Sequence, residues 1–333
     1  PLATLIREEI ARRGPICFER FMELALYHPD YGYYRAGRDP FGRGGDYYTA
    51  AQLQPVFGTL MAACVRALWE EMGRPEEFQV VDLGAGRGEM ASAFSQWSYL
   101  AVEAGRGALP ERFQGVVFAN EFFDALPVRV GVRRGAGFRE LRVAWNGERF
   151  VWAEGEEMRG EAADYLRHFA GDAEEGHVAE VNLRALRWLE ELAARLERGF
   201  VLVIDYGYTA REFGRFPAGT LMSYRRHAAL EDVLAQPGAR DLTAHVCFTA
   251  LEEHGARCGL RTVRRETLTQ TLLRAGESDA FAAALAAQTE PERLRRRLQL
   301  KTLLVGMGET FRTLLLAKEP QQHEGPAGAG RSK

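Results

Sequence analysis

The sequence lacks the features that mark several classes of protein. Its four cysteines, Cys17, Cys64, Cys247 and Cys258, lie far apart without C-x-x-C spacing, which predicts reduced thiols rather than a metal site or a disulfide framework. No apolar run reaches the roughly 18–20 residues of a membrane span, and no signal-peptide hydrophobic region is found. The formal net charge of -3 argues against nucleic acid as the main partner. We therefore expect a cytoplasmic protein without metal, membrane or nucleic-acid partner.

Short apolar runs alternate with helical patterns along most of the chain. The runs are apolar at consecutive positions, as expected for parallel strands that are covered on both faces. This alternation predicts an α/β fold with a Rossmann-like, doubly wound sheet. The expected strands are 78–83, 98–103, 115–121, 199–207 and 311–319, and the expected helices are 2–13, 18–26, 52–72, 87–96 and 183–198.

Residues 80–91, VVDLGAGRGEMA, place three glycines at alternate positions after the first strand of this sheet. A dinucleotide fingerprint would have its last glycine one residue after Gly88, and no G-K-[ST] follows for a phosphate loop. Asp82 would lie badly beside a pyrophosphate but suits a ligand with an ammonium group. Glu103 ends the next strand, where an acid can accept both ribose hydroxyls. The three glycines Gly84, Gly86 and Gly88, together with Asp82 and Glu103, form a pattern that resembles the class I S-adenosylmethionine-dependent methyltransferases. The resemblance implies that these five residues bind the cofactor.

Four further stretches surround the glycine motif in a fixed order. They are YHPDYGYY (27–34), GGDYYTAAQLQPVFG (44–58), ANEFFDALPV (119–128) and DLTAHVCFTAL (241–251). In this order they resemble the MidA family of methyltransferases, which includes the mitochondrial complex I assembly factor that acts as a protein arginine methyltransferase. The resemblance covers most of residues 15–320. It implies S-adenosyl-L-methionine as cofactor and an arginine side chain of a partner protein as methyl acceptor.

Two positions depart from the family pattern. Cys247 stands where family members usually have aspartate in an H-V-D-F stretch. Only residues 104–114 separate the second strand from the third, which is too short for the helix, strand and loop that the resemblance implies there, because a parallel crossover needs about a dozen residues or more. We expect that strand and loop to be trimmed, so the family's adenine contacts cannot be transferred to this chain.

An arginine acceptor sets a chemical requirement. Guanidinium is a cation that must approach the cationic donor, so the site needs carboxylates that pair with it and orient one nitrogen. Glu121, expected at the carboxyl edge of the sheet, is the first candidate catalytic residue. Asp124 either assists or caps the next turn, and Asp205 either lines the pocket or shapes a turn. Asn120 either orients the acceptor or binds the donor, and His245 either removes a proton or is a structural histidine.

The stretch GGDYYTAAQLQ has two interpretations. In the first, Thr49 caps a helix whose N-terminus faces the cofactor's carboxylate, Thr49 and Gln52 hydrogen-bond the donor, and Tyr33, Tyr34 and Tyr47 close over it. In the second, this is a capped helix under a packed aromatic loop. The family resemblance favours a lid.

Residues 128–158 alternate apolar and polar positions around Asn146-Gly147, which predicts an antiparallel hairpin insertion. We divide the chain into four regions on this basis. They are N-terminal helices and an aromatic lid loop over the cofactor site (1–73), a methyltransferase core (74–208 plus 311–320), a mostly helical, substrate-facing accessory region (209–310) and a disordered tail (321–333).

The sequence leaves three functions open. The first is methyl transfer to a protein side chain, the second is transfer to a small molecule, and the third is a non-catalytic, cofactor-binding assembly module. The insertion at 128–158 is a candidate homodimer interface. The basic run RLRRRLQLK (293–301) is either a solvated helix face or a surface for an acidic partner.

Overall fold

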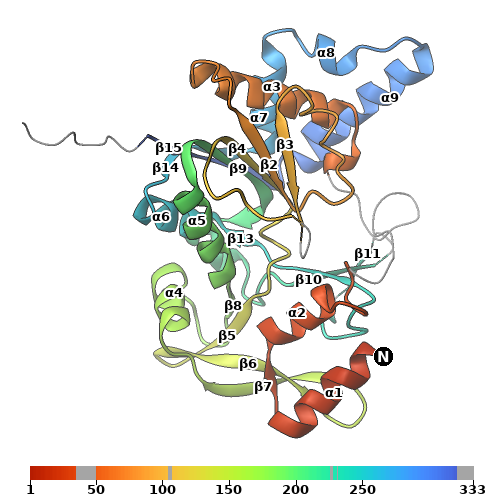
Figure 1. The fold of residues 1–333 in the computed structure, drawn as a ribbon. Helices are drawn as coiled ribbons and strands as arrows, with labels where there is room; N and C mark the ends of the chain where they lie inside the picture. The colour runs from red at the N-terminus through yellow and green to blue at the C-terminus, as the bar shows by residue number, and fades with distance from the viewer. Residues whose placement is uncertain (35–49, 104–106, 226–227, 231, 321–333) are drawn as a thin grey trace, which may run out of the picture.

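The computed structural model describes residues 1–34, 50–103, 107–225, 228–230 and 232–320. Two lobes follow one another in space, an upper lobe around a large mixed sheet and a lower lobe around an antiparallel sheet (Figure 1). In the described part of the chain, no helix is long and apolar enough to cross a bilayer. The lid-loop residues 35–49 and the proposed tail at 321–333 lie outside the described residues.

The sheet of the upper lobe has the strand order β14-β15-β9-β4-β2-β3. The neighbours from β9 to β3 are parallel, and β15 lies antiparallel to both β9 and β14. The short strand β13 (Val246–Cys247) adds a parallel pair at the end of β9. The predicted strands are therefore confirmed: β2 (Gln79–Leu83), β3 (Ser98–Val102), β4 (Phe113–Asn120), β9 (Leu196–Tyr208) and β15 (Phe311–Lys318), with β14 (Arg261–Thr267) as an additional edge strand.

Helices cover both faces of this sheet, so the doubly wound fold is confirmed. On one face, α3 (Val56–Glu71), α7 (Leu268–Glu277), α8 (Ala282–Leu285), α9 (Glu290–Lys301) and the π-helical segment η3 (Thr302–Met307) surround one apolar cluster. On the other face, α5 (Leu183–Arg195) and α6 (Phe248–Arg257) close a second cluster. Burial of these two clusters fixes the sheet between its helical layers.

The lower lobe contains the predicted antiparallel insertion. The strands β5 (Arg129–Arg134), β6 (Gly137–Trp145) and β7 (Phe150–Glu157) form a meander that β1 (Ile16–Cys17) and β8 (Val178–Val181) extend. The hairpin between β6 and β7 turns at Asn146, whose side chain accepts the backbone N–H groups of Glu148 and Arg149. The helix α4 (Glu161–Phe169) and a small sheet of β10 (Met222–Arg225), β11 (Ala228–Leu230) and β12 (Asp241–Thr243) complete the lobe.

The N-terminal helices α1 (Leu2–Arg13) and α2 (Phe18–Tyr27) also belong to the lower lobe. Their buried side chains share one cluster with Val130 and Val143 of the insertion and with Leu242 of β12. Segments far apart in the sequence therefore build the lower lobe, whereas α3 packs on the upper sheet.

Two expectations about helices are wrong. Residues 87–96 form a series of turns instead of a helix, because Gly86 and Gly88 take positive φ angles of 58° and 79° and the bonds that follow are mainly of the i to i+3 type. The helix expected from 52 is divided into a 3₁₀ turn, η1 (Ala50–Gln52), and α3, since Pro55 has no N–H to donate within a helix. Residues 209–310 contribute the strands β10 to β14 and the 3₁₀ turn η2 (Ala210–Arg215), as well as helices.

The short connection between β3 and β4 has the expected consequence. In its described part, residues 103 and 107–112, it contains no helix and no strand of a ladder, so β4 follows β3 almost directly. The strand β3 bonds to β2 alone among the described strands and forms the edge of the sheet. The trimming predicted from the sequence is confirmed.

Candidate active site

The glycine turn follows β2 at the carboxyl edge of the sheet. Gly84, Gly86 and Gly88 have φ angles of 68°, 58° and 79°, a region that residues with a Cβ rarely adopt. A Cβ added to Gly84 would lie 3.0 Å from the ring of Phe122, so the turn packs directly against the segment after β4. The backbone N–H of Gly86 donates to Glu103 at 2.5 Å. The turn, Glu103 and the end of β4 therefore meet at one place.

Asp82 lies at the base of this turn and is buried. Its carboxylate accepts a hydrogen bond of 2.6 Å from the hydroxyl of Tyr99. Burial, with smaller contributions from the carboxylates of Glu103 and Glu89, raises the pKa of Asp82 to about 7, although the hydrogen bond from Tyr99 acts in the opposite direction. A cationic group bound here would restore the charged form of Asp82, because opposite charge offsets the cost of burial.

Two side-chain amides at this edge have buried atoms without a hydrogen-bond partner. They are both amide atoms of Gln52, on η1, and the Oδ1 of Asn120, at the end of β4. A buried polar group that is left unpaired costs about 1–3 kcal/mol, so such groups mark places where a polar ligand binds. The orphaned amides, the glycine turn and the buried Asp82 fit a small ligand that carries amino, carboxylate and ribose groups.

Glu121 follows β4 directly and has an unusual backbone conformation. Its φ angle of 53° lies in the left-handed region, which is uncommon for a residue with a side chain and often marks functional sites. Its carboxylate accepts hydrogen bonds from the N–H of Ala50, at 3.0 Å, and from the amide of Asn120, at 3.2 Å. Burial, with smaller contributions from Asp205 and Asp241, raises the pKa of Glu121 to about 8.

Three buried aspartates lie around Glu121. Asp205, at the end of β9, accepts the backbone N–H groups of Phe123, Asp124 and Tyr206, so it shapes the turn after β4, one of the two roles considered for it. Burial holds the pKa of Asp124 well above its ordinary value, and Asp205, Glu121 and Asp241 contribute to this. One oxygen of Asp124, Oδ1, is buried without a hydrogen-bond partner.

His245 and Tyr34 reach this region from the lower lobe. The backbone of Ala244 donates to the carbonyl of Asp124 at 2.9 Å, which brings His245 to the same edge. Burial lowers the pKa of His245, which favours the neutral ring, and its buried Nδ1 has no hydrogen-bond partner among the described residues. The hydroxyl of Tyr34 donates to Asp241 at 2.9 Å.

Part of the predicted lid has a different place in the structure. Tyr33 is 1% exposed and belongs to the core of the lower lobe, so it does not close over a ligand. Thr49 and Tyr47 lie outside the described residues. Asp241 was given no role from the sequence, although it opens the DLTAH stretch and its side chain lies near Glu121. The sequence feature that could have indicated Asp241 is an acidic residue at the first position of a short strand. This feature alone is weak evidence for a site residue when the fold is not known.

The four cysteines are free, as predicted. Cys247, which replaces the usual aspartate of the family, is buried at the start of α6, and burial raises the pKa of its thiol to about 11. This thiol is therefore protonated and packs as an apolar side chain. Among the described residues, no cluster of side chains has the arrangement of a metal site.

Comparison with known proteins agrees with this geometry. Residues 95–265 match the model of a family of S-adenosyl-L-methionine-dependent methyltransferases. This protein belongs to that family. Its structure resembles that of a COG1565 superfamily member from Burkholderia thailandensis, which was solved with S-adenosylhomocysteine bound. The TM-score is 0.85 and the identity 32%, with coverage of 95% of this chain and 92% of that one.

Two curated relatives have names that specify an acceptor. The Drosophila melanogaster protein arginine methyltransferase NDUFAF7 homolog, mitochondrial, is 29% identical over 74% of this chain and 68% of its own length. The Homo sapiens protein arginine methyltransferase NDUFAF7, mitochondrial, is 27% identical over 93% of this chain and 82% of its own length. The MidA-type resemblance is confirmed, and this chain is a methyltransferase that uses S-adenosyl-L-methionine.

Proposed function

We propose that this methyltransferase transfers its methyl group to a guanidinium nitrogen of an arginine in a partner protein. The observation that carries the proposal is the group of carboxylates at the carboxyl edge, where Asp205 and Asp241 add to the burial that raises the pKa values of Glu121 and Asp124. No lysine or arginine of the described residues forms an ion pair with Glu121 or Asp124. Buried acids such as Glu121 and Asp124, which have no such partner among the described residues, suit a cationic acceptor. The names of the two relatives support arginine.

Glu121 and Asp124 would hold the acceptor. Guanidinium presents five N–H donors in a planar fork, which two carboxylates can bind from adjacent sides. When bound, S-adenosylmethionine supplies an electrophilic methyl group on a sulfonium. As the new N–C bond forms and the C–S bond breaks, the nitrogen loses one proton. The pKa of Glu121 is about 8 in the cofactor-free protein, and the bound guanidinium cation would lower it and return the side chain to its ionised form. The ionised carboxylate then accepts this proton, or the neutral His245 receives it.

The cofactor residues are proposed from the same edge. Asp82 would pair with the amino group and Glu103 with the ribose, while Gly84, Gly86 and Gly88 give the backbone room to approach. The orphaned amides of Asn120 and Gln52 would bind the polar groups of the donor. Thr49 and Tyr34 keep the roles in cofactor binding proposed from the sequence, although the hydroxyl of Tyr34 already bonds Asp241.

The test is Glu121→Gln, which keeps the shape of the side chain and removes its charge. With labelled S-adenosylmethionine and a cell lysate, we expect the wild type to label protein at arginine and the variant to lose at least about 100-fold in rate. Calorimetry should show that the variant still binds the cofactor. Glu154→Gln, on the surface of β7, is the matched control and should keep full activity.

Two results would contradict the proposal. If Glu121→Gln labels the lysate like the wild type while it binds cofactor, Glu121 is not catalytic. If a metabolite takes up the label and no protein does, the acceptor is a small molecule.

We also propose a cytoplasmic location and a homodimer that forms through the β5–β7 meander, where Trp152 is 37% exposed. The two relatives carry mitochondrial names, so fractionation of the source cells decides the location. Sedimentation equilibrium of the wild type and of Trp152→Ser shows whether the protein is a dimer and whether the dimer needs Trp152. A monomeric wild type rules it out.

A further inference from the structure

The outer helices of the upper lobe carry apolar side chains that no described residue covers. Seven large hydrophobic side chains are exposed in the described structure, and four of them lie here: Leu273 on α7, Leu294 and Leu298 on α9, and Val305 on η3. Leu294 and Leu298 are 59% and 55% exposed, and α9 buries none of its residues. Because they lie four residues apart, the two leucines share one face of α9. A concentration of this kind marks an interaction surface.

Positive charge surrounds these leucines. From Glu290 to Lys301 the chain has five cations and two carboxylates, a net charge of +3, whereas the whole chain has -3. The two carboxylates are already paired, Glu290 with Arg293 and Glu292 with Arg296. In the described structure, Arg295, Arg297 and Lys301 are exposed and form no ion pair. We call Leu294, Leu298 and Val305, together with these three cations, the outer cap.

The helix that carries most of the outer cap contacts the segment that leads to Glu121. The side chain of Gln299, on the inner face of α9, donates to the carbonyl of Gln54 at 2.7 Å. The segment 50–54 in turn presents the N–H of Ala50 to Glu121 at 3.0 Å. In Figure 1, α9 lies above the start of α3, on the side from which this segment reaches the sheet. A protein bound to the outer cap would therefore lie close to the acidic site.

We propose that the outer cap docks an acidic segment of the protein acceptor that also carries apolar side chains. The inference rests on the proposed function for the nature of the acceptor. Unpaired cations beside exposed leucines are complementary to carboxylates beside apolar residues, and such complementarity selects partners and speeds their association. The docked segment would raise the local concentration of the arginine at Glu121.

Two other occupants fit the outer cap less well. A second copy related by a two-fold axis would place the same patch on both sides, so Arg295, Arg297 and Lys301 would face their own copies. A membrane-binding helix usually offers tryptophan or phenylalanine to the lipid, and residues 290–307 contain no aromatic residue. The chemistry therefore favours an acidic protein segment.

The test uses two defined peptides. The first is a helix of leucine and glutamate at amphipathic spacing, joined by a flexible linker to a glycine-arginine-glycine tail, and the second has lysine in place of each glutamate. Fluorescence anisotropy should show binding of the acidic peptide alone. Arg295→Glu with Arg297→Glu, and separately Leu294→Ser with Leu298→Ser, should each weaken this binding at least about tenfold. Leu5→Ser and Arg12→Glu with Arg13→Glu, on the exposed face of α1, are the matched controls and should leave it unchanged.

Kinetics add a second measurement. The outer-cap variants should have a higher KM for the acidic peptide and an unchanged kcat. Their rate of methylation of the glycine-arginine-glycine tail without the helix should also be unchanged. Binding without methylation would contradict the proposed function but not the docking surface. Equal binding of the acidic and lysine peptides would overturn the docking surface. So would a wild type that binds phosphatidylserine vesicles when only the outer-cap variants lose this binding. A dimer that is lost only in the outer-cap variants would overturn it as well.

Discussion

Gly84 shows how a single residue can join the glycine turn after β2 to the segment that follows β4. Its φ of 68° requires glycine, and its Cα faces the ring of Phe122, next to Glu121. A side chain here would be strained in its backbone and would also push Phe122 away.

Gly84→Ala should therefore destabilise the fold by about 1–3 kcal/mol and weaken cofactor binding, measured by urea unfolding and calorimetry. Gly135→Ala is the matched control, because Gly135 also has a positive φ of 56° but no atom within 4 Å of an added Cβ. It should lose stability without losing affinity. Equal loss of affinity in both variants would show that the contact with Phe122 is unimportant.

The charge of Glu121 links stability to pH. Its pKa rises from 4.5 to about 8 on folding, so the folded state favours the protonated form. Stability from this group is present below about pH 4.5 and is lost as the pH rises toward 8. We expect the Tm of the cofactor-free wild type to fall more between pH 5 and pH 9 than the Tm of Glu121→Gln. Parallel Tm curves would mean that Glu121 is charged throughout.

At the scale of elements, the start of α5 supports the turn that follows β4. The side chain of Asn182 accepts the N–H of Ala185 at 2.9 Å as a helix cap, and its amide donates to the carbonyl of Phe123 at 3.0 Å. One side chain therefore ends β8, begins α5 and holds the turn that positions Glu121 and Asp124.

Asn182→Ala should cost about 1–3 kcal/mol of stability and also lower kcat, because the turn after β4 loses a support. Thr267→Ala removes a comparable cap, from α7, where the hydroxyl accepts the N–H of Gln270. This control should lose stability alone. Urea unfolding and single-turnover rates separate the two effects, and a normal rate in Asn182→Ala would contradict the positioning role.

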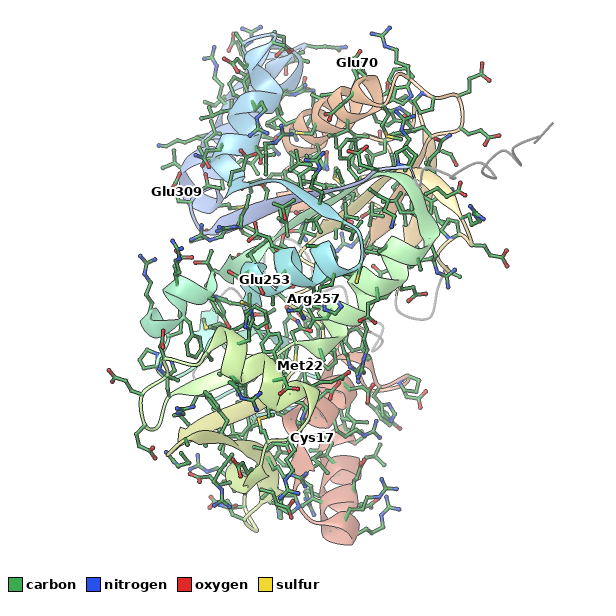
Figure 2. The ribbon with its side chains drawn as sticks, turned by 90° about the vertical axis from the view of Figure 1, so that its left-hand side faces the viewer. Cys17, Met22, Glu70, Glu253, Arg257 and Glu309 are labelled. Atoms are coloured by element: carbon green, nitrogen blue, oxygen red, sulfur yellow. The ribbon has the colours of Figure 1, made fainter. Side chains whose placement is uncertain are left out.

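At the scale of the whole molecule, the two lobes are joined by polar contacts of α2. Arg184, on α5, pairs with Glu19 at 2.7 Å and with Glu23 at 2.9 Å. The hydroxyl of Tyr27 donates to the carbonyl of Ala125 at 2.9 Å. In Figure 2, Met22 marks α2, and Glu253 and Arg257 mark α6.

Arg184→Met should lower the free energy of unfolding by about 1–2 kcal/mol, because it breaks two half-buried ion pairs and leaves two acids unpaired. Arg187→Met, three residues along α5, breaks one exposed pair with Glu161 and should cost less than about 0.5 kcal/mol. Urea unfolding at low and high salt measures both. Equal values would show that the pairs of Arg184 do not hold the lobes together.

The sequence by itself determined the parallel sheet, the glycine turn, the hairpin insertion and the position of Glu121 at a strand end. These depend on short-range patterns, namely consecutive apolar residues, glycines that permit positive φ and an Asn-Gly turn, each of which acts within a few residues. The same local reasoning was wrong for 87–96, where helix formers compete with two glycines that keep the chain in turns.

Only the tertiary structure decided which distant side chains meet. Asp241 comes to Glu121 from β12. The helices α1 and α2 pack on the insertion instead of the core sheet, because their apolar faces are buried there. A local sequence pattern does not show which surface buries an apolar face. The structure also decided between the roles of Asp205 and showed that α9 leaves its leucines and cations outward. Pairing between segments 100 or more residues apart depends on the whole fold, and a sequence pattern does not record it.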